Sequence, residues 1–137
     1  MNDLVAEREV TLDRVEEIFK DAVLTTERDG ARLYVSEDGV NVLFRINPDR
    51  ARLSMLSAWP FRHAFPDDEK LVFANSLNNW ATTGRFAMPD STGLVCDHYI
   101  LFNDGLDPVQ LVGTVKRFVS ICHAVLGRDS AGMLGTD

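Results

Sequence analysis

The sequence predicts an α+β fold in which helices pack on one face of a five-stranded, mainly antiparallel sheet. Three stretches repeat apolar residues at the three- and four-residue spacing of a helix, while five shorter stretches have the pattern of strands. The elements are expected in the order α-β-β-β-α-β-β-α, which is typical of the α+β class. The length of 137 residues suits a single domain, expected over residues 10–127, followed by a disordered tail over residues 128–137.

The first half of the chain predicts a helix followed by a three-stranded meander. Thr11 is placed to cap a helix over residues 11–24, because its hydroxyl can accept a hydrogen bond from a free backbone amide. The apolar stripe of that helix comprises Leu12, Val15, Ile18, Phe19 and Ala22. The strands are predicted over residues 31–36, 40–46 and 52–59. Asp38-Gly39 supplies the positive φ of a tight hairpin, so the strands are expected to pair in sequence order.

The second half predicts a helix, a hairpin and a longer helix. Asp67-Asp68 begins the first of these helices, because negative charge is favourable near free helix amides. Strands are predicted over residues 85–88 and 94–102, and the second is apolar on both faces, which favours a place inside the sheet. The last helix is predicted over residues 107–127, with Asp107 as its cap and proline at its first position.

Residues 69–126 carry motifs that resemble the YbjN family. The motifs are a helix ending in an Asn-rich turn, ANSLNNW, a strand-turn-strand, RFAMPDSTGLVCDHYILF, an acidic connector with proline, and an amphipathic helix with KRF near its middle. The resemblance extends over about residues 10–127. Members of this family are labelled bacterial sensory transduction regulators, and their fold is similar to that of type III secretion chaperones. The resemblance therefore implies a chaperone-like fold and a non-enzymatic, protein-binding role, and it brings no catalytic residues.

The charge and hydrophobicity of the chain argue against two classes of partner. A net charge of −7 does not suit nucleic acid, whose phosphates require clustered Lys and Arg. The longest charge-free run, residues 71–84, is too short and too rich in Asn and Thr to cross a membrane. The acidic N-terminus lacks the apolar centre of a secretory signal, so we expect a cytoplasmic protein.

We predict no catalytic residue, cofactor site or metal site. Cys96 and Cys122 are expected to be reduced core thiols, in preference to a disulfide. His98 alternates with Cys96 on one strand face, where the two side chains could meet a metal ion, but a lone histidine there is more often part of the core. His63 and His123 are too distant in sequence to complete a zinc motif. The sequence contains no P-loop, dinucleotide-binding, nucleophile-elbow or HExxH motif.

Two groups of residues are the candidates for a protein-binding site. The aromatic group is Trp59, Phe61, Phe65 and Trp80. These side chains either form a surface for a partner or close the core beneath a loop, and the second interpretation is favoured. The amide group is Asn75 and Asn79, with Asn78 beside them. Asn is a mediocre helix former, so these side chains are expected to cap the helix, to bond the facing hairpin or to recognise a peptide backbone, with capping favoured.

The leading hypothesis is a small module that binds an unidentified protein or peptide through a sheet face or a helix groove, and that forms a homodimer. The rival is a small-molecule sensor or an uncatalogued enzyme with a pocket between sheet and helices. Its rim would carry His98 with Asp97 or Arg45. A deep pocket with converging polar groups favours the rival, whereas a filled core with exposed apolar surface favours the module.

Overall fold

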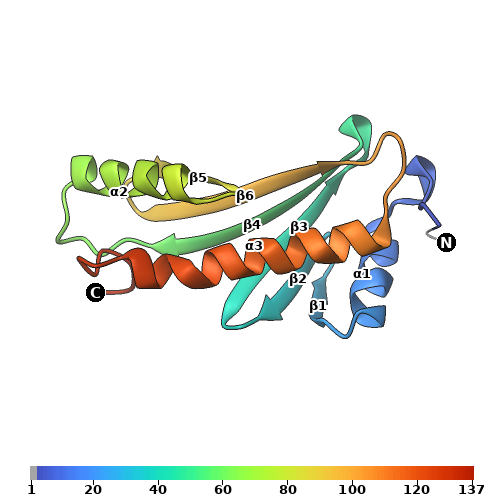
Figure 1. The fold of residues 1–137 in the computed structure, drawn as a ribbon, viewed down its shortest axis with the longest axis horizontal. Coiled ribbons are helices and arrows are strands. Elements are labelled where there is room, and N and C mark those ends of the chain that lie inside the picture. Colours follow the sequence, from blue (N-terminus) through green and yellow to red (C-terminus); the bar gives the residue numbers. More distant parts are fainter. Residues whose placement is uncertain (1–2) are drawn as a thin grey trace.

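The computed structural model describes residues 3–137 as three α-helices packed on one antiparallel sheet (Figure 1). The helices are α1 (Leu12–Asp21), α2 (Asp67–Trp80) and α3 (Pro108–Arg128). The strands are β1 (Thr25–Asp29), β2 (Arg32–Glu37), β3 (Val40–Asn47), β4 (Arg52–Pro60), β5 (Arg85–Asp90) and β6 (Gly93–Leu101). Short 3-10 helices cover Glu7–Glu9 and Pro48–Arg50. The strands lie in the order β1-β2-β3-β4-β6-β5 with antiparallel pairing throughout, which confirms the predicted α+β class.

The sheet has six strands, so the prediction of five strands was wrong. The additional strand, β1, reads TTERD and pairs with β2 from Thr25 opposite Ser36 to Asp29 opposite Arg32. Because it contains no apolar residue, hydrophobic alternation does not reveal it, and backbone pairing at the sheet edge makes it a strand. The same segment shortens α1, which ends at Asp21 before Val23 turns the chain with a positive φ of 62°.

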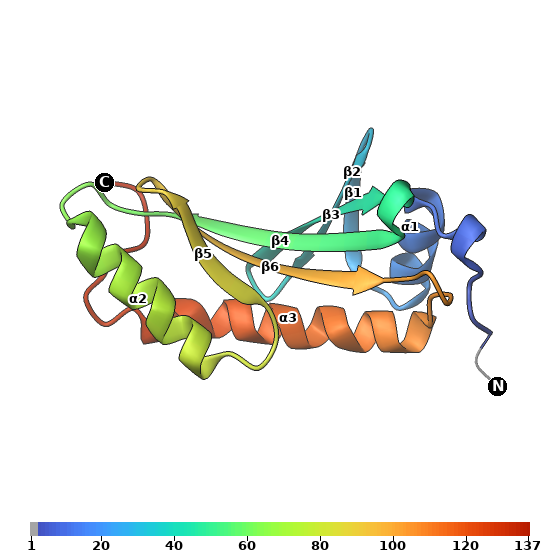
Figure 2. The same cartoon turned by 90° about the horizontal axis from the view of Figure 1, so that it is seen from above.

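The three helices cover one face of the sheet (Figure 2). α3 crosses that face, while α1 lies beside β1 and α2 beside β5. The core between the layers includes Phe19 of α1, Phe44 of β3 and Phe118 of α3, all fully buried. The ring centroids of Phe19 and Phe44 lie 4.8 Å apart. β6 lies between β4 and β5, as its two apolar faces predicted.

The opposite face of the sheet carries no helix (Figure 2). Strand register places Tyr34, Leu43, Leu56 and Asp97 side by side across four neighbouring strands. The Asp97 carboxylate is paired with the Arg85 guanidinium of β5, with an N–O distance of 3.0 Å. This uncovered face therefore mixes half-buried apolar side chains with paired charges.

α3 is, by length and composition, able to cross a membrane, but the fold uses its apolar side as core. Its buried side chains are Leu111, Val115, Phe118, Val119, Cys122 and Val125. The Asp107 carboxylate accepts a hydrogen bond from the Val109 amide at 3.0 Å, and Pro108 takes the first helical position, as predicted. α3 is therefore the central helix of a packed domain.

Residues 129–137, expected to be disordered, fold back against the end of β4 in the structure. The Asp129 carboxylate accepts hydrogen bonds from the Met133 and Leu134 amides at 2.8 and 2.9 Å, which turns the chain after α3. Leu134 is buried and forms an isolated β-bridge with Phe61. Leu134, the partly buried Met133 and one capping carboxylate anchor an otherwise small and polar segment, and none of them produces a periodic pattern.

Candidate protein-docking site

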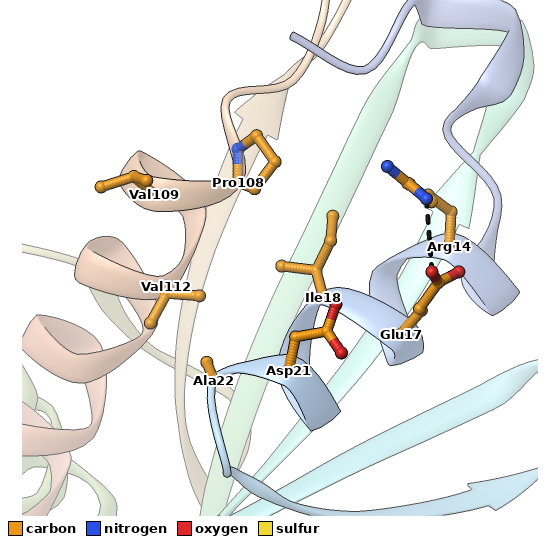
Figure 3. A pocket seen from close by; sticks show the side chains of 8 residues that line it. All are labelled: Arg14, Glu17, Ile18, Asp21, Ala22, Pro108, Val109 and Val112. Atoms are coloured by element: carbon orange, nitrogen blue, oxygen red, sulfur yellow. Dashed lines mark hydrogen bonds and ion pairs between the residues drawn. The ribbon is translucent and has the colours of Figure 1, made fainter. Parts of the chain in front are cut away.

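An apolar groove open to solvent lies between α1 and the first turns of α3 (Figure 3). Its apolar lining consists of Ile18, Ala22, Pro108, Val109 and Val112. The cavity measures about 420 Å³, which is in the range of sites that bind ligands or side chains. We call this cavity the α1–α3 groove. No side chain of the fold fills this cavity, so its apolar lining stays open to solvent.

The α1 wall of the groove follows from the start of that helix. The Thr11 hydroxyl accepts a hydrogen bond from the Arg14 amide at 3.1 Å, as predicted from its place before the apolar stripe. Val15 and Phe19 then point into the core and are fully buried. Because neighbouring helix positions are about 100° apart, this orientation directs Ile18 towards the side of α1 that faces α3.

The α3 wall is built from residues on the flank of its core stripe. In Figure 3, Pro108, Val109 and Val112 lie on the first turns of α3 across the open space from α1, with the Val109 side chain directed away from α1. Val112 packs partly against the core, whereas the Val109 side chain is 65% exposed. An exposed valine beside an open apolar cavity is available to a partner at no cost in core packing.

Charged side chains form the rim of the groove on the α1 side. The Arg14 guanidinium pairs with the Glu17 carboxylate at 3.4 Å, and Asp21 lies at the far end of the helix (Figure 3). On another side of α1, Lys20 and Arg28 both contact Glu16, and the Lys20 hydrogen bond is the main cause that lowers the pKa of the Glu16 carboxyl. The groove therefore has an apolar interior and a mainly acidic rim.

The predicted aromatic residues of β4 and its connector lie outside this groove. Trp59 is half-buried and stacks against Phe86, with ring centroids 6.3 Å apart. Phe61 is buried, and the Lys70 ammonium lies 5.3 Å from its ring centroid. The Lys70 ammonium also donates to the Ser91 carbonyl at 2.8 Å, so this buried lysine fastens α2 to the β5–β6 turn.

Phe65 and Trp80, the other two predicted aromatic residues, are half-buried at the two ends of α2. The Arg128 guanidinium lies 4.5 Å from the Trp80 ring centroid, where it covers part of the indole. The structure thus distributes the four aromatic side chains around α2 and the end of β4. Their role in binding a partner stays a prediction.

The Asn-rich end of α2 bonds the facing hairpin through one side chain. The Phe86 amide donates to the Asn78 side-chain oxygen at 2.7 Å, and the Asn78 amide nitrogen donates to the Phe86 carbonyl at 2.9 Å. Asn75 and Asn79 are exposed. Of the three expected roles, Asn78 adopts bonding to the hairpin. Within residues 3–137, no asparagine side chain caps the carboxyl end of α2, so the favoured prediction of capping was wrong.

The polar residues proposed for a catalytic or sensory pocket do not converge. Asp97 and His98 are consecutive strand residues and point to opposite faces of the sheet. Asp97 is paired with Arg85 on the uncovered face, and burial lowers the pKa of His98 on the other. Arg45 lies opposite Ser54, two strands away from β6.

A second hollow, of about 730 Å³, lies between the β2–β3 turn and the end of α3. Two of its polar side chains are used within the fold. The Ser57 hydroxyl donates to the Asn41 carbonyl, and the His123 imidazole bonds the Asp38 carbonyl at 2.8 Å. None of the residues proposed for the rival pocket lines this hollow.

The two cysteines and the possible metal ligands are the candidates for a reactive thiol or a metal site within residues 3–137. Cys96 and Cys122 are buried free thiols. A hydrogen bond with Cys122, together with burial, raises the pKa of Cys96 above its ordinary range, which disfavours a nucleophilic thiolate. Within residues 3–137 no group of three or more His, Cys, Asp or Glu side chains is placed to hold a metal ion.

Sequence reasoning missed the α1–α3 groove, although both walls carry a signal. The predicted stripes of the first and last helices already contained Ile18, Ala22 and Val112 as core positions. Val109 lies outside the predicted apolar stripe of the last helix. An apolar residue at such a position indicates that the apolar side of the helix is wider than the part that faces the core. Which part of this apolar side stays exposed depends on how two helices far apart in sequence pack together.

Comparisons with known proteins agree with the geometry of the fold. A family model, YbjN, described as "Putative bacterial sensory transduction regulator", matches residues 11–126. The crystal structure of YbjN from E. coli is similar with a TM-score of 0.79 at 14% identity, covering 97% of this chain and 99% of that one. The HopA1-SchA chaperone-effector complex is similar with a TM-score of 0.53 at 13% identity, covering 82% and 88%. At these identities the structural likenesses concern the fold, and no curated protein sequence gave a match.

Proposed function

Because this chain belongs to the YbjN family, we propose that it is a non-enzymatic, chaperone-like or regulatory module that binds another protein. The observation that carries the proposal is the α1–α3 groove, with its exposed Val109 and apolar interior. The likeness of the fold to a chain of a chaperone-effector complex supports the same role. The groove offers an aliphatic surface and no group of converging catalytic side chains, so its chemistry suits side-chain docking.

The proposal includes a homodimer in the cytoplasm of a bacterium. The apolar side chains of the uncovered sheet face, Tyr34, Leu43 and Leu56, support self-association, since they are only half-buried in a single copy. Light scattering of the purified chain tests this part, and a monomer mass across micromolar concentrations would contradict it.

Photo-crosslinking from the groove tests the binding role. Benzoylphenylalanine replaces Val109 in one variant and Val72 of α2 in a second, which is a matched control because the two valines are 65% and 68% exposed. We expect position 109 to yield adducts to one recurring segment of a partner protein in cells. Position 72 is expected to give none of these adducts.

A further substitution separates specific adducts from random ones. Adding Val112→Ser to the position-109 variant removes apolar groove surface without adding charge, so the recurring adduct is expected to disappear. The same adducts from positions 109 and 72, or adducts that Val112→Ser leaves unchanged, would contradict docking in the groove.

A further inference from the structure

Three acidic residues of α1, Asp13, Glu17 and Asp21, recur every four positions near the groove. Glu17 and Asp21 line the α1–α3 groove. Glu9, Asp13 and Glu17 line an adjoining hollow of about 380 Å³, which shares Arg14 and Glu17 with the groove. Residues four apart lie on the same side of a helix, about 6 Å from each other along its axis. Asp13, Glu17 and Asp21 of α1 therefore follow one side of the helix, with the Arg14 guanidinium beside them, and Glu17 and Asp21 border the groove itself.

Helix stability does not explain this arrangement. Like charges four residues apart destabilise a helix, and a negative charge at its carboxyl end is unfavourable to the helix dipole. Asp21 is the last residue of α1, and it takes part in none of the ion pairs found within residues 3–137. Asp13, in contrast, pairs with Arg28 at 2.8 Å. Among residues 3–137, the Asp21 carboxylate therefore adds negative charge to the rim without an ion-pair partner.

The groove offers no backbone edge to a partner. Both walls are helices whose interior amides and carbonyls bond within the helix, so an extended segment would find no unpaired strand to join. A helix satisfies its own backbone and presents side chains at three- and four-residue spacing, which is how amphipathic helices occupy hydrophobic grooves.

We propose that the α1–α3 groove accepts an amphipathic helix of a partner protein, with aliphatic anchors on one side and Lys or Arg along its flanks. The anchors contact Val109, Val112 and Ala22, while the cations lie against Glu17 and Asp21. This inference rests on the proposed function, since it specifies the chemistry of the segment that the groove binds.

Three synthetic peptides of about 14 residues, roughly 21 Å long as helices, test the inference. The first has one leucine face and otherwise lysine, the second keeps the leucine face with glutamate, and the third has the composition of the first in scrambled order. Binding to the full chain is measured by fluorescence anisotropy at low and high salt. We expect the Leu/Lys peptide to bind at least about tenfold more tightly than either other peptide, and to weaken as salt screens the rim.

Matched variants locate the charge effect. Glu17→Gln/Asp21→Asn is expected to weaken Leu/Lys binding about threefold to tenfold, as two exposed ion pairs would. Asp49→Asn/Asp68→Asn removes the same charge from exposed sites away from the groove and is expected to leave the affinity unchanged. An equal loss in both double variants would mean general attraction by the net charge and would overturn the inference.

The outcomes separate this inference from the proposed function. If the Leu/Lys and Leu/Glu peptides bind equally and Val109→Ser/Val112→Ser abolishes both, the charge preference is wrong while docking in the groove stands. If the scrambled peptide binds as well as the Leu/Lys peptide, the helical anchor pattern is wrong. If neither amphipathic peptide binds and position 109 yields no specific adduct, both proposals fail.

Discussion

At the scale of single residues, the Asn78 side chain bonds the edge strand β5 in the way that a neighbouring strand would. Its amide group bonds both the N–H and the carbonyl of Phe86, so α2 is attached to the outer edge of β5 by a pair of hydrogen bonds. Asn75 and Asn79 lack such partners among the hydrogen bonds of the described residues and are exposed. A favoured helix former at position 78 would lose both bonds, which explains why a mediocre one is present.

Replacing Asn78 with Ala is expected to lower the free energy of unfolding by about 1–2 kcal/mol, because it removes two hydrogen bonds from a partly buried backbone position. Urea denaturation measures the change. Asn79→Ala, which replaces an exposed side chain of the same type one position away, is the control and is expected to be within about 0.5 kcal/mol of the parent. Equal effects of the two substitutions would show that the Asn78 bonds contribute nothing specific.

The sequence suggested this interaction only in part. Three asparagines near a helix end indicated bonding to the hairpin as one of three roles, but the choice of residue depends on the rotation of α2 relative to β5. That rotation is set by burial of Phe73, Ala74 and Leu77, which are spaced as one helical stripe. The stripe was visible in the sequence, whereas the strand edge that it approaches was not.

At the scale of elements, the C-terminal segment behaves as an additional piece of the sheet layer. Leu134 is buried beside Phe61, and the Gly135 amide donates to the Pro60 carbonyl at 2.8 Å. The Asp137 carboxylate also bonds the His63 imidazole, and this bond holds the pKa of Asp137 below its ordinary value. The segment therefore covers the connector between β4 and α2.

Leu134→Ala is expected to destabilise the chain by about 2–3 kcal/mol, because it removes a buried side chain and leaves a cavity. Thermal unfolding followed by circular dichroism measures the loss. Thr136→Ala, an exposed position in the same segment, is expected to leave the melting temperature unchanged. A parent-like melting temperature for Leu134→Ala would mean that residues 129–137 do not pack as described.

The elements that sequence reasoning missed share a physical cause. β1 and the C-terminal segment are short, mostly polar, and held by backbone bonds to elements far away in sequence or at a sheet edge. Periodicity detects elements that bury a regular stripe, so α1, α2, α3 and the interior strands were predicted, with boundaries displaced by a few residues at most. Segments whose order depends on pairing lack that signal.

At the scale of the whole molecule, the groove exists because two helices from opposite ends of the chain lie on the same face of one sheet. Ile18 and Val109 belong to helices that are separated in sequence by all six strands of the sheet, and they line one groove because α1 and α3 pack against each other. Family resemblance indicated a protein-binding fold, but not where the binding surface lies. The location that we propose follows from packing, and the charge along α1 is the basis for the kind of partner that we propose.

Two-dimensional ¹H–¹⁵N NMR spectra of the chain, recorded during titration with the Leu/Lys peptide, test the central claim most directly. The account predicts that the largest shift changes fall on residues 12–22 and 109–112 and saturate at one peptide per chain. Changes centred instead on Tyr34, Leu43 and Leu56 would place the binding surface on the uncovered face of the sheet and contradict the assignment of the α1–α3 groove.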